Sequence, residues 1–364
     1  DLFSEHKYSW QTSPIMIGYR QSLFGYNSLK WDKRIEPVRY QEAKKSYVET
    51  LELVSANAIN KFFALATAQS NYDIASFNYA NADTLYRYAQ GRYNIGTITE
   101  NEMLQLELNR LTEETNRMNA RIEMDNCMQE LRSYLGIQEE REIRVRVSSR
   151  IPDFSINLNE ALALAYENSP DIQTMKRRKL ESESAVARAR ANAGLKADIY
   201  LRFGLTQTAD KLPEAYRNLL DQQYVSLSIS LPILDWGRGK GQVRVARSNR
   251  DLVYTQVEQN RTDFELNVRK LVKQFNLQTQ RVRIAARTDE TAQRRNEVAR
   301  KLYILGKSTI LDLNASISEK DSARRNYVSA LYNYWSLYYT LRSMTLYDFE
   351  SNKLLTEDYN LLIE

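Results

Sequence analysis

The sequence Tyr93-Asn94-Ile95-Gly96-Thr97-Ile98-Thr99 returns 210 positions later as Tyr303-Ile304-Leu305-Gly306-Lys307-Ser308-Thr309. Both copies keep the tyrosine, the glycine and the last threonine at the same places. At the same shift Asn57 matches Asn267, and Asn116 matches Asn326. A fixed shift without gaps is the signature of an internal repeat. We therefore expect an internal duplication with a 210-residue shift, in which each copy turns at its glycine.

Long apolar stripes flank these turns. Their spacing of three and four residues is typical of one face of a helix in near-heptad register. The first stripe is Ala43, Tyr47, Leu51, Val54, Ala58, Phe62 and Leu65. Its counterpart 210 residues later is apolar at six of seven places. We predict helices at about 28–92 and 238–302, each roughly 100 Å long. Shorter returning helices are predicted at about 98–135 and 308–346, so the fold class is mainly α with long antiparallel coiled-coil helices.

Three segments, at about 14–24, 198–207 and 224–234, alternate apolar and polar residues with the period of a strand. The apolar set is Ile15, Ile17, Ile199, Leu201, Phe203, Val225, Leu227 and Ile229. A soluble sheet would cover this face with a core, whereas a transmembrane β-barrel would turn it toward lipid. We favour the barrel because no amphipathic partner accompanies the strands except the long helices.

The repeat predicts the organisation of the chain. Residues 1–136 form the first repeat and residues 157–346 the second. A charged connector at 137–156 has a strand-like alternation at Ile143, Val145 and Val147, and a tail follows at 347–364. The second repeat begins with a helix at about 157–196 and the strand 198–207, which have no counterpart in the first. We therefore expect a segment of about 50 residues before Asp1, because a strand without its partner leaves an unpaired edge.

Composition removes several classes of function. The 364 residues include only 11 Gly and 6 Pro, which is too few for a loop-rich enzyme fold. One His and one Cys leave no disulfide and no Cys-cluster metal site, so we expect no enzyme, cofactor or metal. Basic and acidic residues nearly balance, with a net charge of +5, which does not indicate a nucleic-acid partner.

Three segments of the second repeat together resemble a known family, the TolC-like outer-membrane efflux proteins. The run from Leu231 to Val243, LPILDWGRGKGQV, is similar to the family's strand-to-helix junction. The run from Tyr303 to Leu313 is similar to its hairpin tip, and the run from Ala323 to Tyr334 to its returning helix. Their order and spacing make the set more specific than any one of them.

The resemblance implies a homotrimer whose protomers share one outer-membrane β-barrel and extend a helical α-barrel into the periplasm. A small mixed equatorial belt joins the helices midway. It implies partners as well: a periplasmic adaptor (membrane fusion) protein, an inner-membrane transporter and outer-membrane lipid. The chain would be a passive duct of a tripartite efflux or type I secretion system. The alternative is a soluble periplasmic helical adaptor or scaffold, and the cargo stays open between drugs, metals and proteins.

The resemblance also implies site residues. Tyr303 and Asp312 match a tyrosine and an acid that close the periplasmic aperture, and Glu102 occupies the place of Asp312 in the first copy. A solvated helix face is the competing interpretation, and it is favoured for Glu102. Ala315 stands where the family often has a second acid, which puts strong cation binding in doubt.

Two further sets complete the expected sites. The adaptor-docking tips are Gly96, Thr97, Gly306 and Lys307. The strand–helix junction is marked by Pro232, Asp235 and Gly237. The glycines have a structural role at a turn in any case, because glycine adopts positive φ without steric cost.

Overall fold

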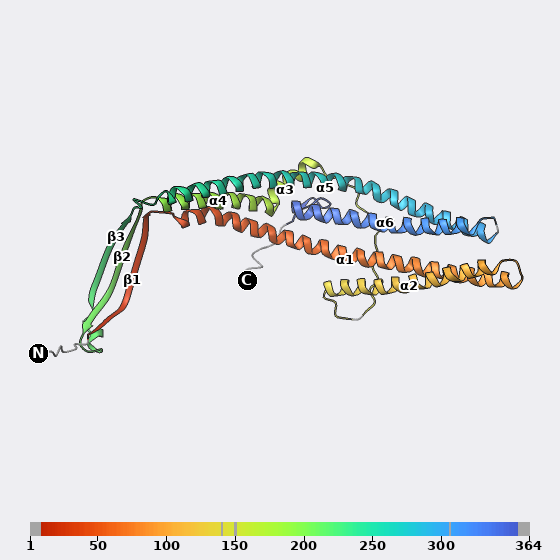
Figure 1. The fold of residues 1–364 in the computed structure, drawn as a ribbon, viewed down its shortest axis with the longest axis horizontal. Helices are drawn as coiled ribbons and strands as arrows, with labels where there is room; N and C mark the ends of the chain where they lie inside the picture. The colour runs from red at the N-terminus through yellow and green to blue at the C-terminus, as the bar shows by residue number, and fades with distance from the viewer. Residues whose placement is uncertain (1–8, 140, 149–150, 306, 356–364) are drawn as a thin grey trace. The chain divides into compact units, whose positions relative to one another are not determined.

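The structure is a computed structural model that describes residues 9–139, 141–148, 151–305 and 307–355. It is mainly helical, in the element order that Figure 1 labels. The chain divides into two compact units, one of Asp1–Glu42 with Asp171–Thr262 and one of Ala43–Pro170 with Asp263–Glu364. Each unit is described by itself below.

Four long helices dominate the chain. Helices α1 (Ser28–Asn94) and α5 (Arg238–Ile304) are each 67 residues long, and they begin 210 positions apart. Helices α2 (Glu100–Tyr134) and α6 (Ile310–Thr345) return from the turns. The ends lie within two residues of the expected ranges, which is the usual uncertainty of a helix boundary. In the part of the chain that the structure describes, none of the helices is both long and apolar enough to cross a membrane.

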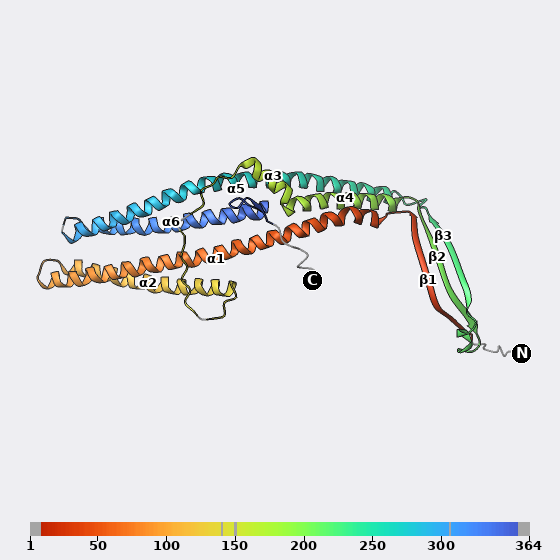
Figure 2. The same cartoon turned by 180° about the vertical axis from the view of Figure 1, so that it is seen from behind.

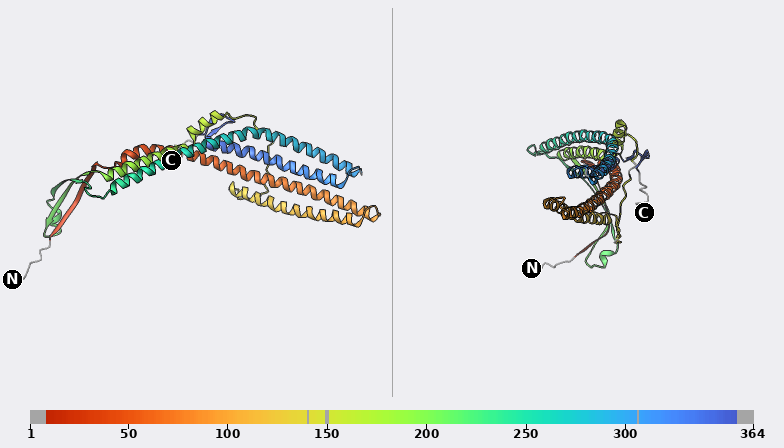
Figure 3. Two further views of the ribbon diagram at one scale, coloured as in Figure 1. Left: turned by 45° about the horizontal axis from the view of Figure 1, so that its top comes forward. Right: turned by 90° about the vertical axis from the view of Figure 1, so that its right-hand side faces the viewer.

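In the second unit, α1 runs beside α2 and α5 beside α6 (Figures 1 and 3). On each long helix one series of buried residues recurs every seven positions, as in coiled coils. On α1 they are Ala68, Ala75, Ala82 and Ala89, and on α5 they are Val268, Phe275 and Val282. The expected stripe on α1 is only partly correct, because Tyr47 and Val54 are exposed whereas Val48 is buried.

Aromatic side chains fill the centre of this unit. The Phe275 ring lies 5.1 Å from that of Tyr334 and 6.0 Å from that of Tyr338, measured between centroids. Phe154, from the connector, packs on Phe275 at 5.4 Å. The Tyr334 hydroxyl donates to the carbonyl of Pro152 at 3.1 Å, so the buried ring has a polar partner.

The strand-like alternation expected in the connector does not form a strand. Ile143 and Val145 have no regular secondary structure and pack against the buried cluster of α1 and α2. The side chain of Gln69 takes the place of a neighbouring strand. Its amide nitrogen donates to the carbonyl of Ile143 and its oxygen accepts from the backbone N–H of Val145, both at 3.2 Å. The alternation therefore reflects one buried face and no ladder. Within the described residues, the segment after α6 forms a strand pair, β4 (Tyr347–Asp348) with β5 (Lys353–Leu354).

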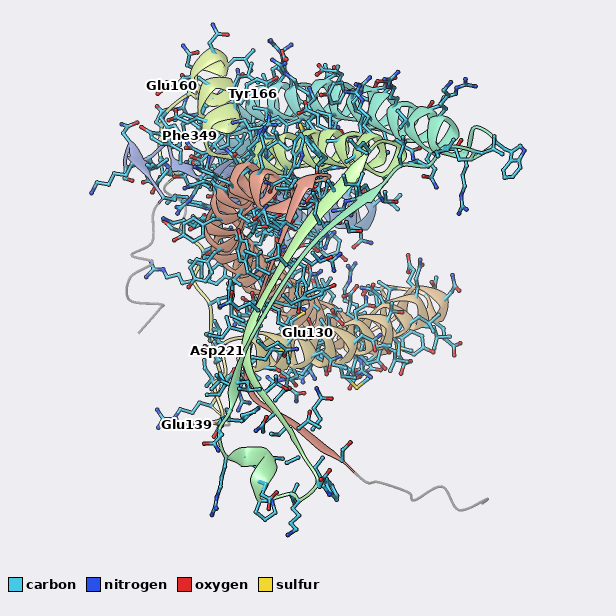
Figure 4. The ribbon with its side chains drawn as sticks, turned by 90° about the vertical axis from the view of Figure 1, so that its left-hand side faces the viewer. Glu130, Glu139, Glu160, Tyr166, Asp221 and Phe349 are labelled. Carbon is cyan, nitrogen blue, oxygen red and sulfur yellow. The ribbon has the colours of Figure 1, made fainter. Side chains whose placement is uncertain are left out.

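The helix expected at 157–196 is two helices, α3 (Leu158–Asn168) and α4 (Pro170–Ala193). Ser169 between them is extended, as the residue before a proline usually is. Tyr166 near the end of α3, labelled in Figure 4, packs on Phe264 and its hydroxyl donates to Glu265 at 3.1 Å.

One antiparallel sheet lies in the first unit, in the order β1 (Trp10–Phe24), β2 (Lys196–Ala209) and β3 (Leu220–Ser230) (Figure 2). The third strand begins earlier and ends earlier than the expected 224–234. Pro232 has no N–H to give to a ladder, so the strand stops before it. A short 3₁₀ turn at Glu214–Tyr216 lies between β2 and β3.

Candidate functional site

The register of the sheet aligns the apolar residues of all three strands. Ile17 lies opposite Phe203, Leu201 lies opposite both Tyr19 and Val225, and Ile199 lies opposite Leu227. Residues directly opposite each other in a ladder share one face. The eight residues expected to face lipid therefore lie on one side of the sheet, and six of them, all but Ile199 and Leu201, are exposed.

The opposite face is polar. Arg202 lies opposite Tyr224, and its guanidinium stands 5.5 Å from the centroid of that ring. Arg20 reaches Asp198 at 3.9 Å. Tyr200 lies opposite Ser226 on the same face. The sheet thus separates an apolar surface from one that carries charges and hydroxyls.

The strand–helix junction is held by the carboxylate of Asp235. It accepts the backbone N–H groups of Gly237 at 3.0 Å and of Gly239 at 2.8 Å, on either side of the first residue of α5. These two hydrogen bonds hold the pKa of Asp235 below its usual range. Trp236 and Gly237 both have left-handed backbone conformations, with φ of 48° and 82°. Pro232 is exposed just beyond the strand.

The hairpin turn after α1 uses the positive φ of Gly96, which is 75°. The N–H of Gly96 donates to the carbonyl of Tyr93 at 2.8 Å, and that of Thr97 to Arg92 at 2.9 Å. Such bonds satisfy the last carbonyls of a helix that ends on a left-handed residue. At the second turn the N–H of Lys307 donates to Leu302 at 2.9 Å, whereas Gly306 lies outside the described residues. Thr97 and Lys307 are exposed, as a docking surface requires.

Two of the expected gate residues are bonded within their own helix starts. Glu102 accepts the backbone N–H of Thr99 at 2.8 Å, and the hydroxyl of Thr99 accepts the N–H of Glu102. Asp312 and Thr309 form the same reciprocal capping box at the start of α6. The hydrogen bonds lower the pKa of both carboxyl groups. This spacing of Thr and acid was legible in the sequence, and it gives both residues a structural role.

We expect Thr99→Ala and Thr309→Ala each to cost about 1 kcal/mol of local stability, because each removes a helix N-cap. The contribution of the two acids should depend on pH. Since their folded pKa values are lowered, it is fully present at neutral pH and is lost as the pH falls through those values. Amide exchange in the first turns of α2 and α6 measures both effects.

Glu102→Gln is the matched control, since glutamine also completes a capping box. It should keep the first turn of α2 protected and remove the pH dependence there. Equal exchange in Thr99→Ala and the unmodified protein would contradict the assignment.

A cleft of about 770 Å³ lies between the two hairpin ends in the second unit, and Tyr303 lines it. Arg92 and Thr97 line it from the first hairpin, and Arg300 and Ser308 from the second. Tyr303 is half-buried, and within the described residues its hydroxyl has no hydrogen-bond partner. The structure therefore places Tyr303 between the two hairpin tips, while Asp312 and Glu102 lie outside the lining of the cleft.

Polar contacts join the two hairpins away from the tips. The side chain of Asn78 on α1 donates to the buried Asp321 on α6 at 2.7 Å. The Arg342 guanidinium on α6 donates to Glu52 on α1 at 3.0 Å. These pairs were not predicted from the sequence. The sequence contains only a weak signal for them, since a polar residue at a buried helical position does not identify its partner.

Metal binding requires clustered ligands, and thiol chemistry requires an accessible thiolate. Within the described residues no group of three or more His, Cys, Asp and Glu side chains could hold a metal ion. Cys127 is half-buried, and burial raises the pKa of its thiol, which disfavours the reactive thiolate.

Comparisons with known proteins agree with this geometry. A family model described as "Outer membrane efflux protein" matches residues 161–345. Among curated proteins there is no significant match. The fold is similar to the CmeC outer membrane channel of Campylobacter jejuni, with a TM-score of 0.74, 14% identity, and 98% of this chain and 80% of that chain covered.

Two further structures have the same fold. A membrane protein from Pseudomonas aeruginosa aligns with a TM-score of 0.71 and 11% identity, covering 96% of this chain and 84% of that one. The outer membrane protein VceC from Vibrio cholerae aligns with a TM-score of 0.67 and 15% identity, covering 93% and 87%.

Proposed function

Because this chain belongs to the outer membrane efflux protein family, we propose that it is the duct subunit of a tripartite efflux or type I secretion system. The family places it in the outer membrane as an efflux channel protein. The finer proposal is that it conducts substrates passively from a periplasmic adaptor and an inner-membrane pump to the exterior. A soluble periplasmic adaptor is disfavoured by the family match and by the likeness to channel folds.

The observation that carries the proposal is the two-faced sheet. Its apolar row includes Val225 and Leu227, which are 66% and 58% exposed. In water such a surface is unfavourable, whereas against lipid chains it is the expected outer face of a barrel. The charged face with Arg202 and Asp198 then lines a water-filled lumen.

The proposed assembly is a homotrimer. Strands β1 and β3 each pair on one side only in the described sheet. Open backbone edges are not tolerated in lipid, so strands from several protomers must close one barrel. The equal lengths of α1 and α5, and their 210-residue offset, support the proposed division into two repeats joined by the equatorial connector.

The hairpin tips are the proposed adaptor-docking sites. The first turn contains Gly96 and Thr97 and the second contains Lys307, and all three residues are exposed. We propose Gly306 as part of the same surface on its place in the sequence. Tyr303 lines the cleft between the tips, so a change in its packing would alter the surface at which the proposed adaptor docks.

We expect the double variant Tyr303→Phe, Asp312→Ala to raise single-channel conductance in a planar bilayer. In the proposed homotrimer the aperture is closed by contacts between hairpins of neighbouring protomers, and loss of the Tyr303 hydroxyl and the Asp312 carboxylate would favour the open state. Glu102→Ala is the matched control, because it breaks the equivalent capping box without touching Tyr303.

An increase in the double variant alone would support a gate at Tyr303 and Asp312. An equal increase with Glu102→Ala would assign the effect to fraying of a helix start. Unchanged conductance in both would place the aperture elsewhere and remove these residues from it.

A further inference from the structure

The link from β3 to α5 continues the apolar face of the sheet beyond the end of the strand. Leu231 and Ile233 follow Val225, Leu227 and Ile229 with the same alternation. Ile233 is 90% exposed, and Leu231 and Leu234 are exposed as well. Exposed apolar side chains therefore continue past Ser230, the last paired residue of the strand, into the junction.

Trp236 stands at the end of this surface and is 88% exposed. It lies between Asp235, whose carboxylate accepts the N–H of Gly237 at the start of α5, and the left-handed Gly237. The turn alone does not require exposure. The residue 210 positions earlier, Tyr26, is half-buried and its hydroxyl lies 2.6 Å from that of Ser184.

A basic segment follows the tryptophan. Arg238, Lys240, Arg244 and Arg247 lie in the first turns of α5, with no acidic residue from position 236 to 249. All four are exposed. Lys240 acts through its charge on the Asp235 carboxylate just before the segment. Lys240, Arg244 and Arg247 have the i, i+4, i+7 spacing that places side chains on one side of a helix.

We propose that this junction, residues 231–247, binds the headgroups of anionic phospholipids on the helical side of the bilayer. The inference rests on the proposed outer-membrane channel function. Tryptophan favours the membrane–water interface, and basic residues beside a membrane segment attract anionic lipid. The exposed leucine and isoleucine side chains lie toward the strand, and the basic residues lie toward the helix. That order matches the passage from acyl chains to phosphate.

A second copy of the chain is the competing occupant. In a cyclic homotrimer the contact is head-to-tail, so a neighbouring copy would bring a different surface to the junction, and the quenching test below decides between the two occupants. Lipid phosphate supplies the opposite charge and an apolar layer at once.

The test uses quenching of tryptophan fluorescence by brominated lipids. The full chain is reconstituted into phosphatidylcholine vesicles that contain a minor fraction of either brominated phosphatidylglycerol or brominated phosphatidylcholine. We expect stronger quenching by the anionic lipid, and the excess should disappear in Trp236→Phe. High salt should reduce it, because screening shortens the range of the charges.

The charge variant Lys240→Gln, Arg244→Gln, Arg247→Gln should lower the phosphatidylglycerol preference at least about fivefold, the effect of one basic residue at the surface. The matched control is Lys270→Gln, Lys273→Gln, Arg281→Gln, which removes three exposed basic residues further along α5. It should keep the preference, and so should addition of inorganic phosphate.

Three results would overturn the inference. They are equal quenching by both lipids, loss of the excess with inorganic phosphate, and a Trp236 that neither lipid quenches because protein covers it. Conductance of the unmodified protein distinguishes failure of the lipid site from failure of the proposed channel function. Channels without a lipid preference would refute only the junction site, whereas absence of channels would refute the proposed function.

Discussion

Placing arginine at Leu227 is expected to cost roughly 2–4 kcal/mol if the residue lies near the bilayer midplane. Leu227 lies opposite Ile199 in the middle of the apolar face, so the new guanidinium would enter lipid. The free energy of unfolding from vesicles, measured by denaturant titration, reports this cost directly. We expect the folded, heat-modifiable band on a gel to fall with it.

Ser228→Arg is the matched control one residue away. Ser228 lies opposite Asp198 on the polar face, where an arginine meets water and a carboxylate. Its effect should be close to zero. Equal losses from both substitutions would mean that the two faces do not meet different solvents, and the barrel would have to be abandoned.

Arg342→Ala is expected to cost about 3–5 kcal/mol, because it leaves a buried carboxylate without its partner. The Arg342 side chain is 15% exposed and that of Glu52 is 10% exposed. Arg342 also lies 5.0 Å from the ring centroid of Tyr339 and 3.5 Å from a carboxylate oxygen of Asp348. The midpoint of urea unfolding, followed by helical circular dichroism in detergent, measures the loss.

Two comparisons sharpen this expectation. Arg283→Ala breaks an exposed pair with Asp153 and should change stability by less than about 1 kcal/mol. The double variant Arg342→Met, Glu52→Leu should recover the part of the loss that comes from Glu52, because it removes both charges of that pair and leaves only Asp348 without Arg342. If the double variant is as unstable as Arg342→Ala, shape and not unpaired charge is the cause.

The long helices and their turns could be predicted from the sequence because their signals are local. A heptad stripe and a glycine such as Gly96 specify a rod and its end without information from elsewhere. The expected helix 157–196 and strand 224–234 ran through Pro170 and Pro232, although proline limits both helix and strand. The connector was misjudged because an alternation like that around Ile143 does not say whether a strand or a glutamine supplies its hydrogen bonds.

In the candidate site, too, local patterns could be predicted and distant partners could not. The two faces of the sheet follow from an alternation that the register aligns across strands. The pair Asn78 and Asp321 could not be predicted, since 243 positions separate them and helical period alone does not choose the partner. The local role of Asp312 was hidden for a different reason. The resemblance drew attention to an aperture, while the nearby Thr309 already gave its carboxylate a partner.

The buried alanines of α1 restrict how this chain can change its length. Ala68, Ala75, Ala82 and Ala89 keep one line along the helix. Inserting seven residues turns the following segment by nearly two whole turns and restores that line, whereas inserting two or five points it elsewhere. The equal lengths of α1 and α5 would then require the same step in the other hairpin to keep their ends level. Among relatives, we therefore expect the two hairpins to differ in length by steps of seven residues, made in both hairpins together.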